Sequence, residues 1–224
     1  MWKVCIDVGG TFTDCIVLDS DRHLGQFKSP TTPEDPSVGC LNALAKAARV
    51  YGYSLASFLE NVELLIHGTT LATNTLINRD GAKTGMITTK GFRDVLEIRR
   101  GYKNIRTSMY NVFVPPYEPL IPRALRLEVD ERMLYDGQVH TQLRENEVQK
   151  AAAQLKEKGV ESVAVCFLHS YANPEHEERA ADISRDVLGD TYITCSSEIL
   201  RVWREWERYS TTVVSAYVGP AVKL

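Results

Sequence analysis

A double glycine between two strand-forming stretches, in residues 6–14 (Ile-Asp-Val-Gly-Gly-Thr-Phe-Thr-Asp), constrains this chain more than any other feature. The stretches on either side, residues 2–6 and 15–18, are apolar and β-branched, which favours the two strands of a hairpin. Gly9 and Gly10 carry no Cβ, so the backbone at the bend can approach another group closely. The pattern fits both an ordinary hairpin with a Gly-Gly turn and a hairpin that binds an anion.

The polar residues of this hairpin favour the anion-binding interpretation. Consecutive backbone N–H groups at Gly9 and Gly10, with the hydroxyls of Thr11 and Thr13 beside them, can cradle a phosphate. Asp7, at the end of the first strand, is placed to hold a metal–phosphate complex or a water molecule, which makes it a candidate catalytic residue and a water-mediated Mg²⁺ ligand. The segment is not a Walker loop, since no Gly-Lys-Ser/Thr follows, and it lacks the third glycine of a dinucleotide-binding turn.

This hairpin resembles the first phosphate motif of the sugar kinase/Hsp70/actin superfamily and, more narrowly, the amino-terminal region of the hydantoinase/oxoprolinase A family. That family includes N-methylhydantoinase A subunits, 5-oxoprolinase, and subunits of acetone and acetophenone carboxylases. Further motifs match in the same order along nearly the whole chain: residues 67–74 (His-Gly-Thr-Thr-Leu-Ala-Thr-Asn), 81–85 (Gly-Ala-Lys-Thr-Gly), 88–98 (Thr-Thr-Lys-Gly-Phe-Arg-Asp-Val-Leu-Glu-Ile), and Glu205 with Arg208.

Composition excludes several classes of protein. The chain has 26 Lys and Arg against 29 Asp and Glu, a net charge of −3, so nothing suggests a nucleic-acid partner. Its apolar runs have the length of strands, so we expect no membrane span. Five cysteines without a Cys-x-x-Cys pair, and a start without the form of a secretory signal, predict reduced, buried thiols and a cytoplasmic protein.

Residues 1–100 are expected to form an α/β domain with a ribonuclease-H-like fold, an assignment that draws on the resemblance as well as on the pattern. A third strand is expected at 23–28, and a buried strand at 64–66. A helix at 74–78 and a further strand at 84–88 follow. Asp35-Pro36 begins a helix that ends near Gly52. Its apolar face is predicted from helical spacing as Val38, Leu41, Leu44, Ala45 and Ala48.

The second half of the chain predicts an additional α/β portion. Residues 101–123, rich in Pro and Tyr, form an irregular excursion. Residues 124–196 alternate expected strands (125–129, 138–140, 163–168, 192–194) with helices that end at Gly159 and Gly189. Residues 197–224 are expected to be a helical entry to a downstream domain. No second phosphate motif occurs, so we expect the adenosine pocket beyond Leu224 and regard the chain as the amino-terminal part of a longer subunit.

Residues 67–74 supply further candidates for the site. The resemblance makes His67 and Thr69 candidate catalytic residues and gives Thr70 and Asn74 a role in positioning substrate or phosphoryl group. A histidine after a strand can act as a general base, but it can also be a hydrogen-bonded structural residue. Hydroxyls at the start of a helix can cap backbone N–H groups, and the same helix start can bind an anion.

Glu205 and Arg208 are also candidates for positioning substrate or phosphoryl group. Their spacing of three places them on one face of a helix. The alternative is an exposed ion pair, which contributes only about 0.3–0.5 kcal/mol.

The resemblance implies an ATP-dependent, Mg²⁺-requiring hydrolase that opens a cyclic amide (a hydantoin, oxoproline or a lactam) after phosphoryl activation. It also implies an oligomer with a hydantoinase B-type partner subunit. One alternative is a subunit of an acetone/acetophenone-type carboxylase, which joins a ketone to bicarbonate. The other is a nucleotide-binding module without catalytic activity, although the intact Asp7, Gly9, Gly10, Thr11 and Thr13 argue against it.

Overall fold

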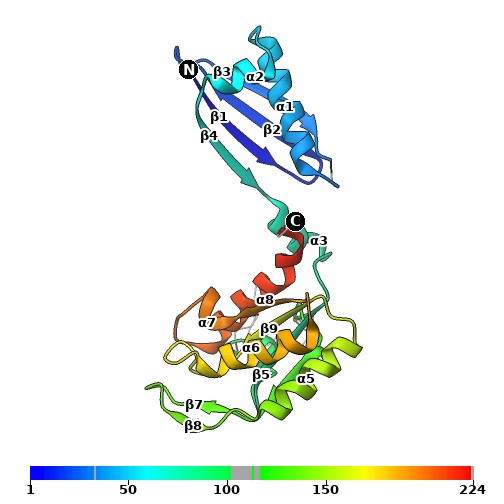
Figure 1. The fold of residues 1–224 in the computed structure, drawn as a ribbon, viewed down its shortest axis with the longest axis vertical. Coiled ribbons are helices and arrows are strands. Elements are labelled where there is room, and N and C mark those ends of the chain that lie inside the picture. The colour runs from blue at the N-terminus through cyan, green and yellow to red at the C-terminus, as the bar shows by residue number, and fades with distance from the viewer. Residues whose placement is uncertain (33, 102–112, 114–116, 223–224) are drawn as a thin grey trace. The chain divides into compact units, whose positions relative to one another are not determined.

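The computed structural model describes residues 1–32, 34–101, 113 and 117–222, and the chain divides into two compact units, Met1–Asp80 and Gly81–Leu224 (Figure 1). Both units are α/β. Most of the predicted irregular excursion at 101–123 lies outside the described residues. Among the described residues, no helix is both long enough and apolar enough to cross a membrane.

The first unit is a four-stranded sheet with α1 on one face. Its elements are β1 (Trp2–Val8), β2 (Phe12–Leu18), β3 (Leu24–Pro30), α1 (Pro36–Val50), α2 (Leu55–Glu60), β4 (Val62–Thr69) and α3 (Leu71–Asn78). The strand order is β3-β2-β1-β4, with β1, β2 and β3 antiparallel and β4 parallel to β1. The predicted hairpin is confirmed, and so is the start of α1, where the Asp35 carboxylate accepts a hydrogen bond from the Ser37 N–H.

Two of our burial predictions for this unit are wrong. In α1, Leu44 and Ala48 are buried as expected, but Val38 and Leu41 are 40% and 48% exposed, because the helix meets the sheet through Gly39, Ala43 and Ala47 instead. The strand predicted as buried at residues 64–66 is about half exposed along its length. The reason is its position: β4 pairs with β1 on one edge and is the outermost strand among the described residues.

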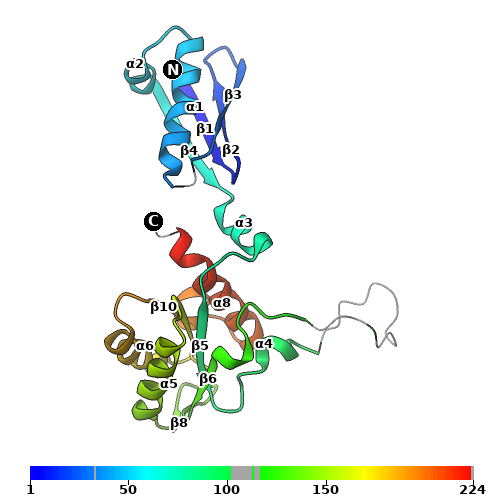
Figure 2. The same ribbon diagram turned by 90° about the vertical axis from the view of Figure 1, so that its right-hand side faces the viewer.

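The second unit is a parallel sheet covered on both faces. Its elements are β5 (Thr84–Thr89), α4 (Val95–Ile98), η1 (Arg123–Leu125), β6 (Arg126–Val129), β7 (Arg132–Met133), β8 (Val139–Thr141), α5 (Glu145–Glu157), β9 (Ser162–Cys166), α6 (Glu175–Leu188), β10 (Tyr192–Cys195), α7 (Ser196–Ile199) and α8 (Glu205–Val222). The strand order is β10-β9-β5-β6, all parallel. Helices α5 and α6 lie on one face and α8 on the other (Figure 2). Strands β7 and β8 pair as an antiparallel hairpin, with Asp136-Gly137 between them.

Strand β5 and helix α8 both pack within the second unit. The strand at 84–88 belongs to the second sheet, where β5 pairs with β6 and β9, so the first compact unit ends at Asp80 and not at residue 100. The carboxyl-terminal helix was expected as an entry to another domain. In the structure, α8 places Tyr209, Val213 and Ala216 in the core of the second unit, and its role as an entry to another domain stays a prediction. Whether residues 1–100, 101–123, 124–196 and 197–224 act as domains in a longer protein stays a prediction.

All five cysteines are free thiols. Cys15, Cys166 and Cys195 are buried as predicted, whereas Cys5 is exposed on the open face of the first sheet. Burial, with the neighbouring Cys5 and Cys40, raises the pKa of the Cys15 thiol to about 11, so this thiol stays protonated at neutral pH.

Candidate functional site

The bend of the β1–β2 hairpin is too tight for side chains at its two glycines. The Gly9 N–H donates to the Phe12 carbonyl (3.0 Å), and a Cβ on Gly9 would lie 2.9 Å from that oxygen. A Cβ on Gly10 would lie 3.1 Å from Nδ2 of Asn74. The Gly9 N–H is therefore already engaged. Only the N–H groups of Gly10 and Thr11 at the bend have no acceptor among the described residues, which leaves them available to an anion.

Thr13, which was predicted to contact phosphate, lies in the interior of the first unit. This residue is fully buried, and its hydroxyl hydrogen-bonds to the Thr31 hydroxyl (3.0 Å), which donates to the Gly9 carbonyl (2.9 Å). The physical reason is strand alternation, because Thr13 faces α1 while its exposed neighbours face outward. Its hydroxyl thus helps to fix the shape of the bend through Thr31, and its contact with phosphate stays a prediction.

Asp7 lies on the open face of the sheet, opposite the face that α1 covers. Its cross-strand neighbour is Asp14, whose carboxylate is 3.2 Å from the Lys28 ammonium group. On the other side Asp7 pairs with Gly68 of β4, and a Cβ on Gly68 would be 4.0 Å from the Asp7 carboxylate. Asp7 itself is exposed, with no hydrogen bond or ion pair among the described residues. An unengaged carboxylate beside a second one suits an oxygen-ligated cation such as Mg²⁺.

Thr69, Thr70 and Asn74 converge on the hairpin bend. The Thr70 N–H and the Thr69 hydroxyl both donate to the Val8 carbonyl (3.2 and 3.3 Å), and Asn74 Nδ2 donates to the Thr70 hydroxyl (3.2 Å). The Thr69 hydroxyl also accepts the Leu71 N–H (3.1 Å), so it holds the start of α3 as well. Residues 69–74 thus connect the start of α3 to the hairpin bend. The Thr69 side chain is nevertheless exposed.

His67 is exposed but does not share a face with Asp7. The parallel register places His67 beside Ile6, which is buried against α1, whereas Asp7 points to the other face. Successive side chains of a strand alternate between faces, so the His67 and Asp7 side chains lie on opposite sides of the sheet. The two predicted catalytic residues are thus not brought together by the first unit.

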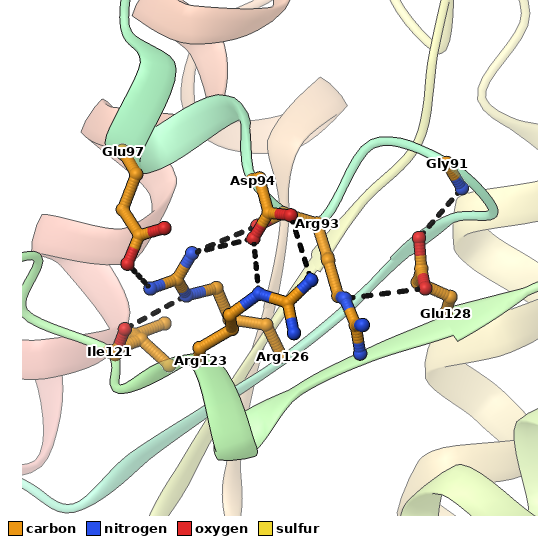
Figure 3. A network of polar contacts seen from close by, with 8 residues as sticks. All are labelled: Gly91, Arg93, Asp94, Glu97, Ile121, Arg123, Arg126 and Glu128. Atoms are coloured by element: carbon orange, nitrogen blue, oxygen red, sulfur yellow. Dashed lines mark hydrogen bonds and ion pairs between the residues drawn. The ribbon is translucent and has the colours of Figure 1, made fainter.

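In the second unit, the motif at residues 88–98 is held by a buried arginine that our sequence analysis missed (Figure 3). Arg126 is 1% exposed, and its guanidinium donates to the carbonyls of Ile121 (2.9 Å) and Arg93 (3.1 Å) and to the Glu97 carboxylate (2.9 Å). The one available signal was a charged residue inside the apolar run Ala124-Leu125-Arg126-Leu127. These contacts fix α4 against the start of β6, which is a structural role.

The neighbouring charges extend this network. Arg123 forms a bidentate pair with Asp94 (2.9 and 3.0 Å), and the hydrogen bonds from Arg123 lower the pKa of the Asp94 carboxyl. Glu128 lies 3.5 Å from the Arg93 guanidinium and accepts the Gly91 N–H (2.6 Å). The motif at 88–98 therefore stabilises the loop that follows β5.

Glu205 and Arg208 do not form the surface ion pair that we considered as an alternative. Glu205 is exposed in the first turn of α8, whereas Arg208 is 1% exposed. Arg208 donates to the Ser196 hydroxyl (2.9 Å) and to the carbonyls of Val202 and Phe167. Both residues nevertheless line one hollow of about 190 Å³.

Comparison with known proteins gives the chain its family. The family described as "Hydantoinase/oxoprolinase N-terminal region" matches residues 3–188. The chain is 38% identical to the alpha subunit of caprolactamase from Pseudomonas jessenii, over 99% of this chain and 32% of that protein. It is 35% identical to the gamma subunit of acetophenone carboxylase from Aromatoleum aromaticum, over 96% of this chain and 31% of that protein.

Solved structures agree with this relationship. The ATP-dependent caprolactamase of Pseudomonas jessenii superposes with a TM-score of 0.85 at 38% identity, over 99% of this chain and 32% of that chain. A nucleotide-free acetone carboxylase superposes with a TM-score of 0.88 at 27% identity, over 98% and 33%. The chain therefore belongs to the hydantoinase/oxoprolinase family, as its motifs predicted, and spans about a third of the length of these relatives.

Proposed function

We propose that this member of the hydantoinase/oxoprolinase family is the amino-terminal part of an ATP-dependent enzyme that hydrolyses a cyclic amide. The observation that supports this proposal best is the hairpin bend. Gly9 and Gly10 leave their backbone without side chains, and Thr70 and Asn74, at the start of α3, lie against the bend. The Asp7 carboxylate at the end of β1 is exposed and has no partner among the described residues. The caprolactamase relative is named as an ATP-dependent enzyme, and its subunit is among the more similar proteins.

In this proposal the first unit binds the phosphates of ATP. The N–H groups of Gly10 and Thr11 contact a phosphate oxygen, and Asp7 holds Mg²⁺ through water. The positive end of α3, which begins beside the bend, adds favourable electrostatics. Transfer of the γ-phosphoryl group to the amide oxygen makes the carbonyl carbon reactive toward water, and the protein mainly positions the groups and neutralises charge.

A second candidate is a subunit of an acetone- or acetophenone-type carboxylase. The acetone carboxylase structure has the same fold over 98% of this chain, and the acetophenone carboxylase subunit is 35% identical. In that reaction a ketone enolate oxygen receives the phosphoryl group before reaction with bicarbonate. A phosphate-binding hairpin suits both reactions equally. The preference for a cyclic amide over a ketone therefore depends only on the slightly higher identity to the caprolactamase subunit, 38% against 35%.

The decisive experiment measures nucleotide turnover by the longer protein, here called the complete subunit, together with a hydantoinase B-type partner. ADP release is followed with a hydantoin, 5-oxoproline or a lactam, and in parallel with acetone or acetophenone plus bicarbonate. Stimulation by a cyclic amide supports the main proposal, and stimulation by a ketone with bicarbonate supports the carboxylase. No stimulation by either class would support a binding module without catalytic activity.

We further propose that the first unit is part of a ribonuclease-H-like domain that this chain does not complete. Three antiparallel strands followed by a helix and a strand parallel to β1 begin that order. The next strand of the order is not β5, which lies in the other sheet. On β4, Leu64, Leu65 and Ile66 are 46%, 47% and 53% exposed, and together they occupy both faces of the strand. A parallel strand apolar on both faces is typical of a sheet interior. We therefore place a further strand, supplied by the rest of the complete subunit, on the free edge of β4.

This placement predicts that Leu65→Ala has different effects in the two proteins. In the 224-residue chain, where Leu65 is half exposed, the free energy of unfolding should fall by less than about 1 kcal/mol. In the complete subunit, where the side chain would be buried, the loss should be about 2–5 kcal/mol. Urea unfolding of both proteins measures this, with Val50→Ala, a 72% exposed position in α1, as the control. Small, equal losses in both proteins would contradict the added strand.

A second prediction concerns the affinity of the 224-residue chain for ATP. The first unit offers phosphate contacts, while we expect the adenosine pocket in the downstream part. Phosphate contacts alone must offset the entropy of association, so we expect a Kd of about 1 mM or weaker. Isothermal titration calorimetry with Mg-ATP measures it. A micromolar Kd would show that the nucleotide site is contained in this chain.

A further inference from the structure

The second sheet has a topological switch point between β5 and β9. In the order β10-β9-β5-β6 the chain leaves β5 toward β6 on one side and leaves β9 toward β10 on the other. All these strands are parallel, so their carboxyl ends lie along the same edge. In open α/β sheets, ligands bind in the crevice at this edge, where the connections diverge.

A hollow of about 190 Å³ lies at the carboxyl end of β9. Its walls come from the loop after β9 and from the segment that leads into α8. The polar and aromatic residues lining it are His169, Tyr171, Trp203, Arg204, Glu205 and Arg208. All belong to the second unit, so the hollow is formed without any contribution from the phosphate hairpin.

The buried part of the hollow carries a positive charge that bonds directly to no carboxylate in the described part of the chain. Arg208 is 1% exposed, and all three of its hydrogen-bond acceptors are neutral: the Ser196 hydroxyl and the carbonyls of Val202 and Phe167. The Glu177 carboxyl bonds to the same Ser196 hydroxyl, so it reaches Arg208 only through Ser196. A guanidinium has five N–H groups, and these three bonds leave donors unused.

The exposed part of the hollow is also suited to an anion. Arg204 stacks on the Trp203 ring, 4.1 Å from its centroid, and forms no ion pair among the described residues. Glu205 is the only carboxylate in the lining, and it is exposed. His169 faces Arg132 and Arg208 as well as Glu205 and Glu131. Burial and the two arginines lower its pKa, so at neutral pH the ring is uncharged and can still donate one N–H.

We propose that this hollow binds the oxyanion group of a small acidic molecule, either a carboxylate or a phosphate. Arg204 and His169 contact the oxyanion at the mouth, and Arg208 provides the positive charge beneath it. Guanidinium groups suit both anions, because their N–H groups match the paired oxygens of either. All the residues of this site belong to the second unit, and the proposed function gives none of them a role.

The test is calorimetric titration of the 224-residue chain with inorganic phosphate and, separately, with malonate, at ionic strength held constant with sodium chloride. We expect saturable binding of at least one probe, weakened tenfold or more by Arg204→Gln and by His169→Gln. Arg185→Gln, which removes an exposed charge from α6, is the matched control and should leave the affinity unchanged. These mouth variants avoid the buried Arg208, whose replacement risks unfolding the unit.

The two probes and a hairpin variant separate the possible outcomes. Binding of phosphate alone, malonate alone or both, each lost in the mouth variants, supports the proposal and identifies the anion. No saturable binding, or equal weakening by Arg185→Gln, would overturn it. Phosphate binding that is lost in Gly10→Val but kept in Arg204→Gln would also overturn it, while supporting the phosphate hairpin.

Discussion

Replacing Asp7 by alanine in the complete subunit is expected to lower ATP turnover about 100-fold or more while leaving the fold intact. The first effect follows from its proposed position as the Mg²⁺-holding carboxylate, since disturbing such a position costs one to several powers of ten in activity. The second follows from its surroundings. Asp7 is exposed on the open face of the sheet and engages no other described residue, so the free energy of unfolding should change by less than about 0.5 kcal/mol.

A coupled assay for ADP release and urea unfolding measure the two effects of Asp7→Ala. Asp7→Asn, which keeps the shape and removes the charge, should lose turnover to a similar degree. Asp21→Ala is the matched control, because Asp21 is an exposed carboxylate in the loop after β2. Wild-type turnover in Asp7→Ala would show that Asp7 has no role in binding the metal–nucleotide complex. A large loss of stability would instead assign it a structural role.

The local elements of the fold were predictable because their signals are local. Gly9 and Gly10 between two apolar stretches indicated the hairpin, and Asp35-Pro36 indicated the start of α1. In the second unit the glycines after α5 and α6 marked the ends of those helices. Each of these signals comes from the conformational preferences of a few consecutive residues, and the residue types alone indicate those preferences.

The sequence did not show which strands and helices pack against one another. Residues 84–89 have the composition of a buried strand, which fits either sheet, and only packing against β6, β9 and Leu155 decides the choice. The apolar residues 64–66 were interpreted as buried because apolar strands usually are. Their exposure reflects the position of β4 at the edge of the described sheet, and no local pattern reports that position.

The sequence indicated which segments carry the candidate site residues, but not how deeply each side chain is buried. The tightness of the bend and the approach of Asn74 to it agree with the motif-based expectation. The burial of Thr13 depends on strand register, which places it toward α1. Arg126 and Arg208 were missed as buried cations, because charged residues are rarely buried and the sequence does not show the carbonyls that surround them. Whether such a residue is buried and structural or exposed and free to bind a ligand depends on contacts between distant parts of the chain, and its residue type does not show this.

Glu177 shows how such buried charges hold the second unit together. It is fully buried, and its carboxyl accepts hydrogen bonds from the N–H groups of Phe167 (2.7 Å) and Ser197 (2.8 Å) and from the Ser196 hydroxyl. These donors belong to two loops, one after β9 and one at the start of α7. The same Ser196 hydroxyl accepts a hydrogen bond from Arg208. One carboxyl group therefore joins α6 to the loop after β9 and to the start of α7.

Glu177→Ala is consequently expected to destabilise the chain by about 3–5 kcal/mol, the largest loss of stability that we predict for the 224-residue chain. The substitution leaves the buried N–H groups of Phe167 and Ser197 without acceptors, at about 1–3 kcal/mol each. It also removes the carboxyl that reaches the buried Arg208 through the Ser196 hydroxyl. Glu177→Gln keeps one acceptor oxygen and should cost about 1–3 kcal/mol. Urea unfolding followed by circular dichroism measures both, with Glu178→Ala, the exposed neighbour on α6, as the matched control near zero. If Glu177→Ala costs no more than Glu178→Ala, water or other groups satisfy the donors, and the carboxyl does not hold these loops in place.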